Sequence, residues 1–491
     1  MRSMIDARTL GANRSAAIEG IAYDSRAVKK NYLFIAVSGY ASDGHAFMEK
    51  AISAGASAIL HNRTFDVRAV SARYPNVAFI PVENTRIAMA DIAARFYGRP
   101  SESMNIVAVT GTNGKTTTAM LIKNIFEACG RMAGLIGTIH NLIGSEKIKS
   151  IHTTPESVDL QSFLAEMKRR GANDLIMEAS SHALYLHRCD ALNFNDIIFT
   201  NITEDHLDFH KTMDAYLDAK MTAFDLLASS CKGERHAILN VHTDRYDIIR
   251  ARIGKTPLVT YGIDARADYR ADAVSISFSG TRYRLLRRGA FALDVQLALT
   301  GDFNVLNSLA AIAYADSAGF PLDTVCGAIA RVQVPGRFEI VTEEHHPFAV
   351  IVDYAHTDDA LRNVLTTIRR LAPARIITVF GCGGDRDRKK RPLMGKAVGE
   401  LSDTAIVTLD NPRTEAIEQI IDDIRPGIDA TGTSYEVIID RREAIAKAVA
   451  SARERDVVLI AGKGHEDYQI FKDRTVHFDD REVAREALSN R

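Results

Sequence analysis

The chain of 491 residues contains no tryptophan, only five cysteines and only 12 prolines. Its cysteines are odd in number and lack paired spacing, which argues against both a disulfide framework and a zinc site. Neither sign of charge is in excess, with 61 Lys and Arg against 62 Asp and Glu, so nothing indicates a nucleic-acid or membrane partner. No apolar run approaches membrane-spanning length, and the N-terminus lacks an apolar signal core. We therefore expect a cytoplasmic protein.

The length and the order of apolar segments indicate three domains, because 491 residues are too many for one hydrophobic core. Strand-like and helix-like segments alternate through the first hundred residues, which predicts a small α/β domain. Turn-forming residues at 97–101 and 334–336 mark two boundaries. We expect an α/β protein with a small N-terminal domain (1–98), a central domain built on a parallel sheet (99–335) and a C-terminal doubly wound, Rossmann-like domain (336–491).

A glycine-rich segment, Gly111-Thr112-Asn113-Gly114-Lys115-Thr116-Thr117, lies between a predicted strand at 105–110 and a predicted helix. This order is the context that a phosphate-binding loop requires. Backbone N–H groups of the turn and the helix N-terminus would face the phosphates, Lys115 would add a positive charge, and Thr116 could hold Mg²⁺. The strict pattern has a further glycine at position 109, where this chain has valine. The segment predicts a site for a nucleoside triphosphate.

Acidic residues follow two further predicted strands of the central domain, at 174–178 and 196–200. Glu178 ends the first strand, and Asp205 and His206 lie in the loop after the second. Ligands bind at the carboxyl edge of an open parallel sheet, and carboxylate oxygens suit Mg²⁺ there. Taken singly, Glu178 is more often a capping or solvated acid, and His206 more often a hydrogen-bonded loop residue.

Lys220 interrupts the apolar stripe of a predicted helix at 213–227, three residues after Leu217 and four before Phe224. A buried ammonium is costly, so such a lysine must reach solvent with its head, find a partner or lose its charge. A neutral amine could take up CO₂ and become a carbamate, which is a carboxylate-like ligand. Position alone does not choose between these alternatives.

Three other polar clusters have simpler explanations when they are considered alone. The segments 24–26 and 39–45 follow or flank predicted strands and are typical of turns. Asn304 precedes a predicted helix at 305–315, and its amide could meet a purine edge or cap that helix. Its position favours the cap.

Strands and helices alternate regularly beyond residue 336, with predicted strands ending at Asp353, Phe380, Leu409, Ile439 and Ala461. This pattern predicts a doubly wound sheet. Polar motifs follow most of these strand ends, at 353–356, 381–388, 410–413 and 462–466. Charged loops at one sheet edge indicate a ligand site rather than a merely solvated surface.

These motifs together resemble those of the ATP-dependent Mur ligases along nearly the whole chain. The matching segments are Thr110–Thr117, His152–Pro155, Glu178–His182, Thr200-Asn201, Asp205–Asp208, Lys220, Gly301–Asn304, Gly336–Glu339, Val352–His356, Asp385-Arg386, Asp410–Arg413 and Gly462–Glu466. The last three are similar to those of the branch that adds diaminopimelate, and they separate it from its paralogues.

The resemblance implies an amide-bond ligase of peptidoglycan precursor synthesis. ATP would phosphorylate the D-glutamyl carboxylate of UDP-MurNAc-L-Ala-D-Glu, and the amino group of meso-2,6-diaminopimelate would attack the acyl phosphate. A carboxylate is a poor acylating agent, and phosphorylation supplies a leaving group, so the protein contributes positioning and charge stabilisation. The resemblance further implies two Mg²⁺ ions, ATP as co-substrate and a monomer.

The resemblance also assigns roles at the nucleotide site. The catalytic residues would be Lys115, Glu178, His206 and Lys220. Thr116 and Glu178 would hold one Mg²⁺, and His206 and a carbamylated Lys220 (N6-carboxylysine) would hold the second. ATP would be bound by Gly111, Thr112, Asn113, Gly114, Lys115, Thr116, Thr117, Asn304, Arg337 and Asp353.

The donor substrate would lie across the first two domains. Its uridine diphosphate would meet Ser25, Gly39, Tyr40, Ala41 and His45, and its muramyl-peptide arm would meet Thr153, Thr154, Ser180 and Arg188. Leu186 stands where relatives often have glutamine, so the substrate hydrogen bond that the family makes there does not carry over to this position. Asp358 stands where proline is usual, a change that a helix start tolerates.

Diaminopimelate would be bound by Arg386, Asp410, Asn411, Pro412, Arg413, Gly462 and Glu466. Its side chain ends in an ammonium and a carboxylate, whereas that of lysine ends in an ammonium alone. A guanidinium group binds a carboxylate bidentately and repels a bare ammonium. Because Arg386 and Arg413 match the carboxylate-reading arginines, and Glu466 suits the ammonium, we expect diaminopimelate rather than lysine.

Two other functions compete with this interpretation. A folylpolyglutamate synthase would share the ATP and Mg²⁺ chemistry, but the motifs at 410–413 and 462–466 argue against it. A nucleotide-binding scaffold without ligase activity would not need every metal-ligand position, and all of them are present.

Overall fold

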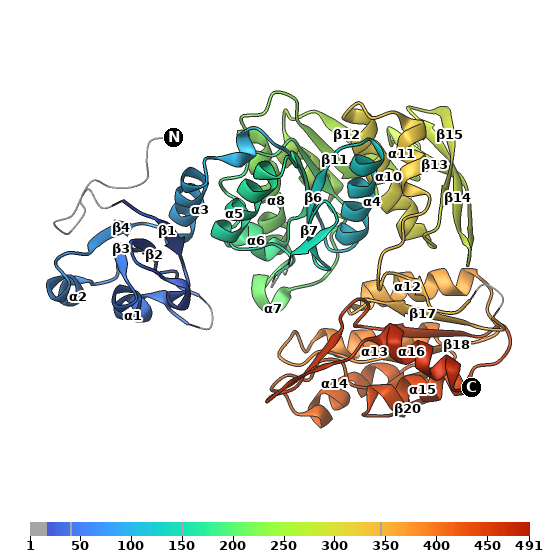
Figure 1. Ribbon diagram of the computed structural model, residues 1–491. Helices are drawn as coiled ribbons and strands as arrows, with labels where there is room; N and C mark the ends of the chain where they lie inside the picture. Colours follow the sequence, from blue (N-terminus) through green and yellow to red (C-terminus); the bar gives the residue numbers. More distant parts are fainter. Residues whose placement is uncertain (1–16, 40–41, 149–151, 344–345) are drawn as a thin grey trace.

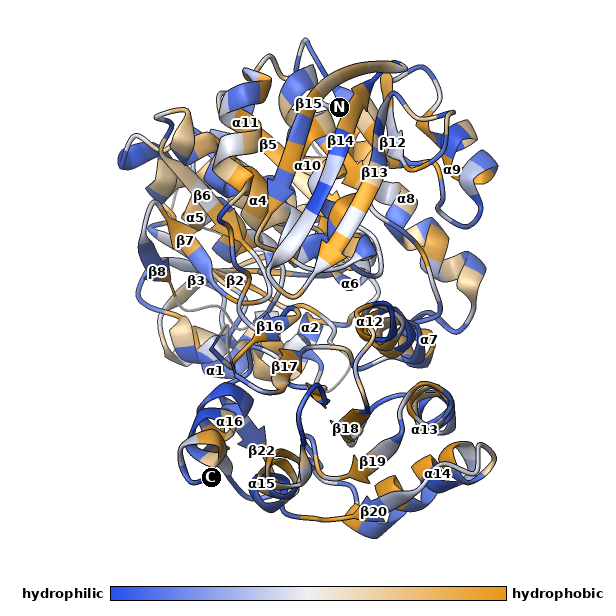
Figure 2. Cartoon of the chain, turned by 90° about the vertical axis from the view of Figure 1, so that its right-hand side faces the viewer, coloured by the Kyte–Doolittle hydropathy of each residue, from blue (hydrophilic) through white to orange (hydrophobic). Residues whose placement is uncertain are grey.

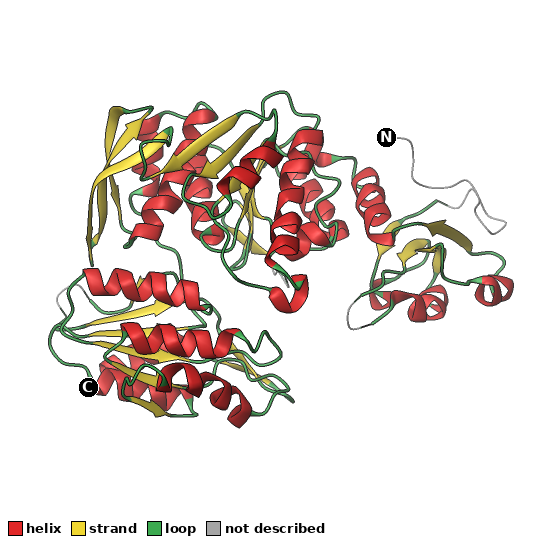
Figure 3. Ribbon diagram, turned by 180° about the vertical axis from the view of Figure 1, so that it is seen from behind, coloured by secondary structure: helices red, strands yellow, loops and turns green. Residues whose placement is uncertain are grey.

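The computed structural model describes residues 17–39, 42–148, 152–343 and 346–491, which form three units with separate sheets (Figure 1). The N-terminal unit (17–97) and the β13–β15 edge of the central unit (100–334) lie on opposite sides of the molecule, and the C-terminal unit (336–491) packs beside the central one (Figures 1 and 3). This arrangement confirms the predicted α/β class. All five cysteines are free. No helix in the described ranges is long and apolar enough to cross a membrane.

The N-terminal unit has a four-stranded parallel sheet in the order β1-β2-β3-β4. Successive residues of its second strand face opposite sides, so that Leu33 and Ile35 join one core and Phe34 joins the other. Its elements are β1 (Gly20–Ala22), β2 (Tyr32–Ile35), β3 (Ala56–Asn62), β4 (Ala78–Val82), α1 (Met48–Ser53), α2 (Arg68–Arg73), α3 (Thr85–Phe96) and the 3₁₀ turns η1 (Ser25–Ala27) and η2 (Gly44–Phe47).

The central unit contains an 11-stranded sheet in the order β15-β14-β13-β12-β11-β10-β5-β9-β6-β7-β8. Its strands are β5 (Asn105–Thr110), β6 (Ala133–Ile136), β7 (Asn141–Ile143), β8 (Glu146–Ile148), β9 (Asp174–Glu178), β10 (Asp196–Phe199), β11 (His236–Asn240), β12 (Leu258–Gly262), β13 (Tyr269–Ser277), β14 (Gly280–Arg287) and β15 (Ala290–Leu297). Its helices are η3 (Pro100–Glu102), α4 (Lys115–Ala128), α5 (Ser157–Arg169), α6 (Ser181–Tyr185), α7 (Leu207–His210), α8 (Met213–Ser229), α9 (Tyr246–Ile253), α10 (Asp302–Ser317) and α11 (Leu322–Ile329).

The middle of this sheet is parallel, as predicted, and β5 lies within it with a core on each face. Antiparallel strands extend both edges. β15 begins at Ala290 because Arg288 and Gly289 form a tight turn with positive φ after β14. Alternating hydrophilic and hydrophobic residues on β14 show that one face of this edge is solvated (Figure 2).

The C-terminal unit has a six-stranded sheet in the order β16-β17-β21-β18-β19-β20, parallel except for β16. A separate core on each face confirms the doubly wound prediction. Its elements are β16 (Glu339–Ile340), β17 (Ala349–Asp353), α12 (Asp358–Arg370), β18 (Ile376–Phe380), α13 (Lys390–Leu401), β19 (Thr404–Val407), α14 (Ile417–Asp429), β20 (Tyr435–Val437), α15 (Arg441–Ser451), β21 (Val457–Ala461), the hairpin β22 (Tyr468–Ile470) and β23 (Thr475–His477), and α16 (Asp480–Ser489).

Candidate functional site

The glycine-rich segment turns directly from the end of β5 into α4. Gly111 and Gly114 have φ of 143° and 84°, and a Cβ at either position would come within 2.0 Å of Thr200 Oγ1 or 2.3 Å of Asn307 Oδ1. Both positions therefore need glycine. Val109 lies in β5 and is fully buried, so valine there strengthens the strand and leaves the turn intact.

The Nζ atoms of two lysines, Lys115 and Lys220, both hydrogen-bond the carbonyl of Gly111, the first residue of this turn. Lys115 Nζ donates to Gly111 O at 3.0 Å and to Thr112 O at 2.7 Å, and Lys220 Nζ donates to Gly111 O at 2.7 Å. Lys220 is only 1% exposed and lies 4.5 Å from the centre of the Tyr216 ring. The structure thus excludes the alternative in which its head reaches solvent. Burial, reinforced by the charge of Lys115, lowers the pKa of Lys220 well below the ordinary value, which favours the neutral amine.

Glu178 lies at the end of β9, is 1% exposed, and is near enough to Lys115 for its charge to oppose the lowering of that lysine's pKa by burial. Its carboxylate accepts hydrogen bonds from Thr116 Oγ1 at 3.0 Å, from Thr138 N at 2.7 Å and from Thr138 Oγ1 at 3.0 Å. The structure therefore brings Thr116 and Glu178 together, and their hydroxyl and carboxylate oxygens form a donor set that suits Mg²⁺.

His206 has a left-handed backbone (φ 56°), and its Nε2 lies 3.3 Å from Asp205 Oδ2. Desolvation is the largest cause that lowers the pKa of His206, and nearby Lys220 and Lys115 act in the same direction. A neutral imidazole can serve as a metal ligand. No group of three or more His, Cys, Asp or Glu side chains among the described residues is arranged to hold a metal ion. Any ion here would also need the oxygens of threonine, modified lysine or substrate.

Asn304 is the third residue of α10, so the expectation that it caps this helix is wrong. Gly301 occupies the cap position with φ of 112°. The amide of Asn304 donates to Thr300 O at 2.9 Å and accepts from Asn307 Nδ2 at 3.1 Å, inside the protein.

The C-terminal unit reaches the phosphate loop through two side chains. Arg337 Nη2 lies 3.4 Å from Thr116 Oγ1, and its guanidinium stacks 4.2 Å from the centre of the Tyr354 ring. Asp359 Oδ2 accepts hydrogen bonds from Asn113 Nδ2 at 2.8 Å and from Thr203 Oγ1 at 3.2 Å. Sequence reasoning missed Asp359, because an acid in the first turn of a helix is common everywhere.

Asp353 is buried, and its carboxylate accepts hydrogen bonds from Phe338 N at 2.6 Å and from Ala355 N at 2.7 Å. It therefore fixes the backbone beside Arg337. Burial raises the pKa of Asp353.

A polar group beside Glu178 joins three of the residues assigned to the muramyl-peptide arm. Thr154 Oγ1 donates to Glu178 O at 2.8 Å, Ser180 N donates to Thr154 Oγ1 at 3.2 Å, and Arg188 Nη1 donates to Thr154 O at 2.9 Å. The fourth, Thr153, lies with its hydroxyl 3.2 Å from Thr138 Oγ1. Leu186 ends α6 beside this group.

Glu156, which the sequence did not single out, joins this group to the N-terminal unit. Its carboxylate pairs with Arg188 Nη2 at 2.8 Å and with Arg86 Nη1 of α3 at 3.1 Å. All three side chains are at least four-fifths buried. The ion pairs therefore connect a predicted substrate-binding arginine to the neighbouring unit.

The two N-terminal clusters form turns capped by aspartates, as expected, with Asp24 capping η1 and Asp43 capping η2. Ser25 is buried in the first turn. His45 Nδ1 lies 2.5 Å from Asp43 Oδ1, and its Nε2 accepts from Asn62 N at 3.0 Å. Gly39 N donates to Ser42 O at 3.0 Å. Tyr40 and Ala41 lie outside the described residues.

Two guanidinium groups lie together at the carboxyl edge of the C-terminal sheet. A Cβ on Gly383 would be 3.0 Å from Arg413 Nη1 and 3.6 Å from Arg386 Cγ. Arg413 Nη1 donates to Gly384 O at 2.7 Å, but neither arginine forms an ion pair with any residue in the described ranges. Burial and then the charge of Arg386 lower the pKa of Arg413. A carboxylate ligand could supply the ionic partner that these two guanidinium groups lack among the described residues.

The acids of the same edge lie on two adjoining loops. Asn411 Nδ2 donates to Glu466 Oε2 at 2.9 Å, and Lys463 Nζ lies 3.2 Å from the same oxygen. Burial and then Asp410 raise the pKa of Glu466. A Cβ on Gly462, which has φ of 117°, would be 3.0 Å from Asp410 Oδ2. Pro412 O would be 1.9 Å from a Cβ on Gly384, so the loops at 381–388 and 410–413 pack tightly against each other.

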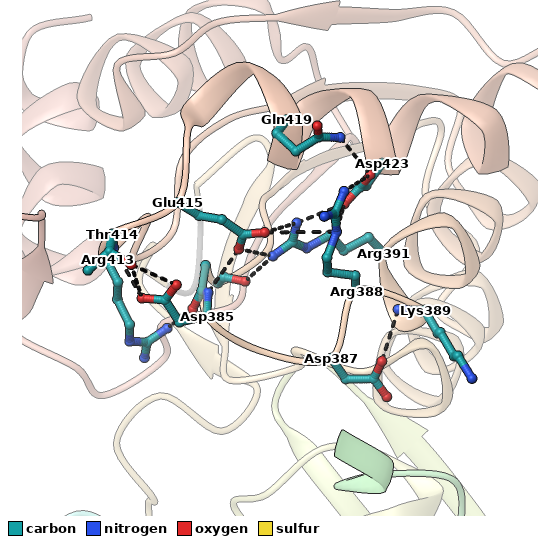
Figure 4. A network of polar contacts seen from close by, with 12 residues as sticks. Asp385, Asp387, Arg388, Lys389, Arg391, Arg413, Thr414, Glu415, Gln419 and Asp423 are labelled. Carbon is teal, nitrogen blue, oxygen red and sulfur yellow. Dashed lines mark hydrogen bonds and ion pairs between the residues drawn. The ribbon is translucent and has the colours of Figure 1, made fainter. Parts of the chain in front are cut away.

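Arg391, with no exposed surface, lies beside Glu415 and Asp423 next to the loop at 381–388 (Figure 4). It binds Glu415, and its Nη1 lies 2.8 Å from Asp423 Oδ2, while its Nη2 donates to Gly383 O at 3.1 Å. Glu415 Oε2 in turn accepts from Asp385 N at 2.8 Å. The network therefore fixes the backbone of the loop that precedes Arg386.

Replacing Arg391 with methionine should destabilise the C-terminal unit by about 3–5 kcal/mol, because two partly buried carboxylates lose their cation. The measurement is the urea midpoint followed by a probe in this unit. The control is Arg388→Ala, since Arg388 binds the same Asp423 at 2.9 Å but is about half exposed, and it should change the midpoint little. Equal decreases of the urea midpoint in Arg391→Met and Arg388→Ala would contradict the expectation.

Comparison with known proteins adds to this geometry. Residues 17–97 match "Mur ligase family, catalytic domain", residues 109–315 match "Mur ligase middle domain", and residues 336–464 match "Mur ligase, glutamate ligase domain".

Curated relatives and a solved structure match the chain almost end to end. The UDP-N-acetylmuramoyl-L-alanyl-D-glutamate–2,6-diaminopimelate ligase of Syntrophomonas wolfei is 46% identical, over 96% of this chain and 94% of its own. The ligase of the same name from Clostridium tetani is 43% identical, over 98% and 96%. A solved structure with that name is 33% identical, covers 96% of this chain and 95% of its own, and has a TM-score of 0.68. The chain therefore belongs to the Mur ligase family.

Proposed function

We propose that the chain uses ATP to join meso-2,6-diaminopimelate to the D-glutamyl carboxylate of UDP-MurNAc-L-Ala-D-Glu. The observation that carries this proposal is the pair of guanidinium groups, Arg386 and Arg413, that lack an ionic partner among the described residues. They lie on the unit whose Arg337 reaches the phosphate loop. The relatives named above bear the name of this activity.

The reaction divides into two steps. The carboxylate of the donor first takes the terminal phosphoryl group of ATP, which gives an acyl phosphate and ADP. The amine of the acceptor then attacks the acyl carbon, phosphate leaves, and the amine gives up a proton as the amide forms. Because the phosphoryl and acyl groups carry negative charge, the protein acts chiefly by positioning and charge stabilisation.

Residues around the phosphate loop would carry out the first step. The loop amides of residues 111–117, Lys115 and Arg337 hold the phosphates, and Asn304 and Asp353 hold the adenosine. Thr116 and Glu178 fit one Mg²⁺, and His206 and a carbamylated Lys220 fit a second. Bound Mg²⁺ would neutralise charge on the transferred phosphoryl group.

Donor binding would divide between the first two units. We assign Thr153, Thr154, Ser180 and Arg188 to the muramyl-peptide arm, and Ser25, Gly39 and His45 to the uridine diphosphate. We assign no substrate hydrogen bond to the apolar side chain of Leu186. We further propose three domains at 1–98, 99–335 and 336–491, acting together in a cytoplasmic monomer.

The acceptor would bind across the edge of the C-terminal sheet. Arg386 and Arg413 would bind the distal carboxylate of diaminopimelate, and Glu466 with Asp410 would bind its ammonium. Asn411, Pro412 and Gly462 would shape the loops between them. Leaving the partly buried Arg413 unpaired would cost up to about 2–5 kcal/mol, which disfavours lysine.

Phosphate release with UDP-MurNAc-L-Ala-D-Glu and ATP tests this proposal in three arms: diaminopimelate, L-lysine and no acceptor. Diaminopimelate should be used more efficiently than L-lysine by about 30-fold to several thousand-fold. Comparable turnover of the two acceptors would contradict the assigned specificity. ATP binding without acceptor-dependent phosphate release would instead favour a scaffold.

A further inference from the structure

Arg441 and Asp480 form an ion pair that has no exposed side-chain surface. Arg441 is the first residue of α15 and Asp480 the first of α16. Arg441 Nε lies 2.7 Å from Asp480 Oδ1, and its Nη2 lies 2.7 Å from Oδ2, so the pairing is bidentate. Apolar residues of similar volume often replace such a pair without loss of stability, so stability alone does not account for it.

The remaining donors of this guanidinium reach two strand ends. Arg441 Nη1 donates to Leu409 O at 3.1 Å, and Nη2 donates to Ala461 O at 2.9 Å. Leu409 directly precedes Asp410, and Ala461 directly precedes Gly462. The Arg441 side chain therefore hydrogen-bonds the last residue before the loop that carries Asp410 and the last residue before the loop that carries Glu466.

The sheet itself does not connect these two loops. In the strand order β17-β21-β18-β19, β18 lies between the strands that lead into them. No ladder hydrogen bond can therefore set the distance between the ends of β19 and β21, whereas the rigid guanidinium fork spans it.

The charge of Arg441 also acts on the two carboxylates assigned to the acceptor amino acid, Asp410 and Glu466. Asp410 and Glu466 are among the groups whose charges raise the pKa of Arg441, which places a permanent cation behind both carboxylates. Lys463 is the other cation beside Glu466, and it bonds that side chain directly.

We propose that Arg441, held by Asp480, is a positioning residue for the acceptor amino acid, because it sets the spacing of the loops that carry Asp410 and Glu466. This inference rests on the function proposed above. It explains what holds Asp410 and Glu466, the residues assigned to the ammonium of diaminopimelate, at their distance from each other. Arg441 touches no substrate in this account. It acts through the backbone at Leu409 and Ala461.

The test is the double variant Arg441→Met/Asp480→Leu, which removes the ion pair without leaving either charge unpaired. Its matched control is Arg375→Met/Asp456→Leu in the same sheet. Arg375 precedes β18 and pairs bidentately with the buried Asp456, which precedes β21, at the opposite edge. The control therefore loses a less buried ion pair, with Arg375 37% exposed, far from the acceptor loops.

The KM for diaminopimelate should rise at least about tenfold in the double variant, since a small misplacement of a binding group has effects of this size. The KM for ATP should stay within about twofold, and the control should change neither. Arg441→Lys, which can reach one carbonyl and Asp480, should give an intermediate KM. If the double variant fails to fold, the KM for diaminopimelate of Arg441→Lys is compared with that of Arg375→Lys, and a rise in the first alone supports the positioning role.

An unchanged KM for diaminopimelate, or parallel increases for diaminopimelate and ATP, would overturn the inference. Failure of the wild-type protein to ligate diaminopimelate would reject the proposed function itself. A wild-type protein that ligates normally beside an unaffected double variant would reject only the positioning role.

Discussion

Replacing Lys220 with alanine should lower the rate of ligation by about 10²- to 10³-fold, the size of effect expected when a preorganised charge-stabilising group is removed. The side chain is almost completely buried, and the low pKa favours the uncharged amine that CO₂ requires. A carbamate on Lys220 would turn a costly buried cation into an anion that can bind Mg²⁺. The rate is measured as diaminopimelate-dependent phosphate release.

Two observations separate a carbamate from a lysine that merely fills space. Formate or bicarbonate should restore part of the activity of Lys220→Ala, and ¹³CO₂ should give a carbamate carbon resonance in the wild-type protein alone. Lys123→Ala is the control, because Lys123 is also buried but pairs with Glu127 on α4. Activity near the wild-type level in Lys220→Ala would rule out a catalytic carbamate.

Replacing Arg413 with alanine should lower kcat/KM for diaminopimelate by about 30-fold to several thousand-fold, equivalent to the 2–5 kcal/mol of a buried charge contact. Most of the change should appear in KM, because the assigned contact is to a part of the acceptor remote from the reacting amine. The ratio of kcat/KM for diaminopimelate to kcat/KM for L-lysine should fall by a similar factor.

Steady-state kinetics with both acceptors measure this effect. Arg388→Ala is a matched control from the neighbouring loop, since Arg388 pairs with Asp423 and is about half exposed. It should leave both KM values close to those of the wild-type protein. An unchanged KM in Arg413→Ala would contradict the assignment of this arginine to the acceptor carboxylate.

The fold was predictable wherever a local pattern determines structure. The phosphate loop between β5 and α4, and the regular alternation of the C-terminal unit, followed from apolar periodicity and glycine placement. The antiparallel edges of the central sheet were not predicted, because pairing partners far apart in sequence decide them. The start of β15 depended on a two-residue turn at Arg288 and Gly289 that no motif marked.

The candidate site was predictable as a set of residues but not as a set of contacts. Sequence could not decide whether Lys220 reaches solvent, because burial depends on what packs over α8. Asn304 was misplaced by a few residues, since Gly301 took the cap position. Glu156 and Asp359 escaped notice because acids are common, and Lys463 was recognised only as part of the motif at 462–466. The folded chain shows the partners of all three.

The Arg86–Glu156–Arg188 ion pairs have a consequence for engineering. Arg86 comes from α3, whereas its acidic partner and the second arginine come from the central unit. A chimera that takes its first hundred residues from a homologue without this arginine would leave Glu156 sharing its charge with Arg188 alone. Graft boundaries for such hybrids are therefore best chosen so that all three side chains come from one parent.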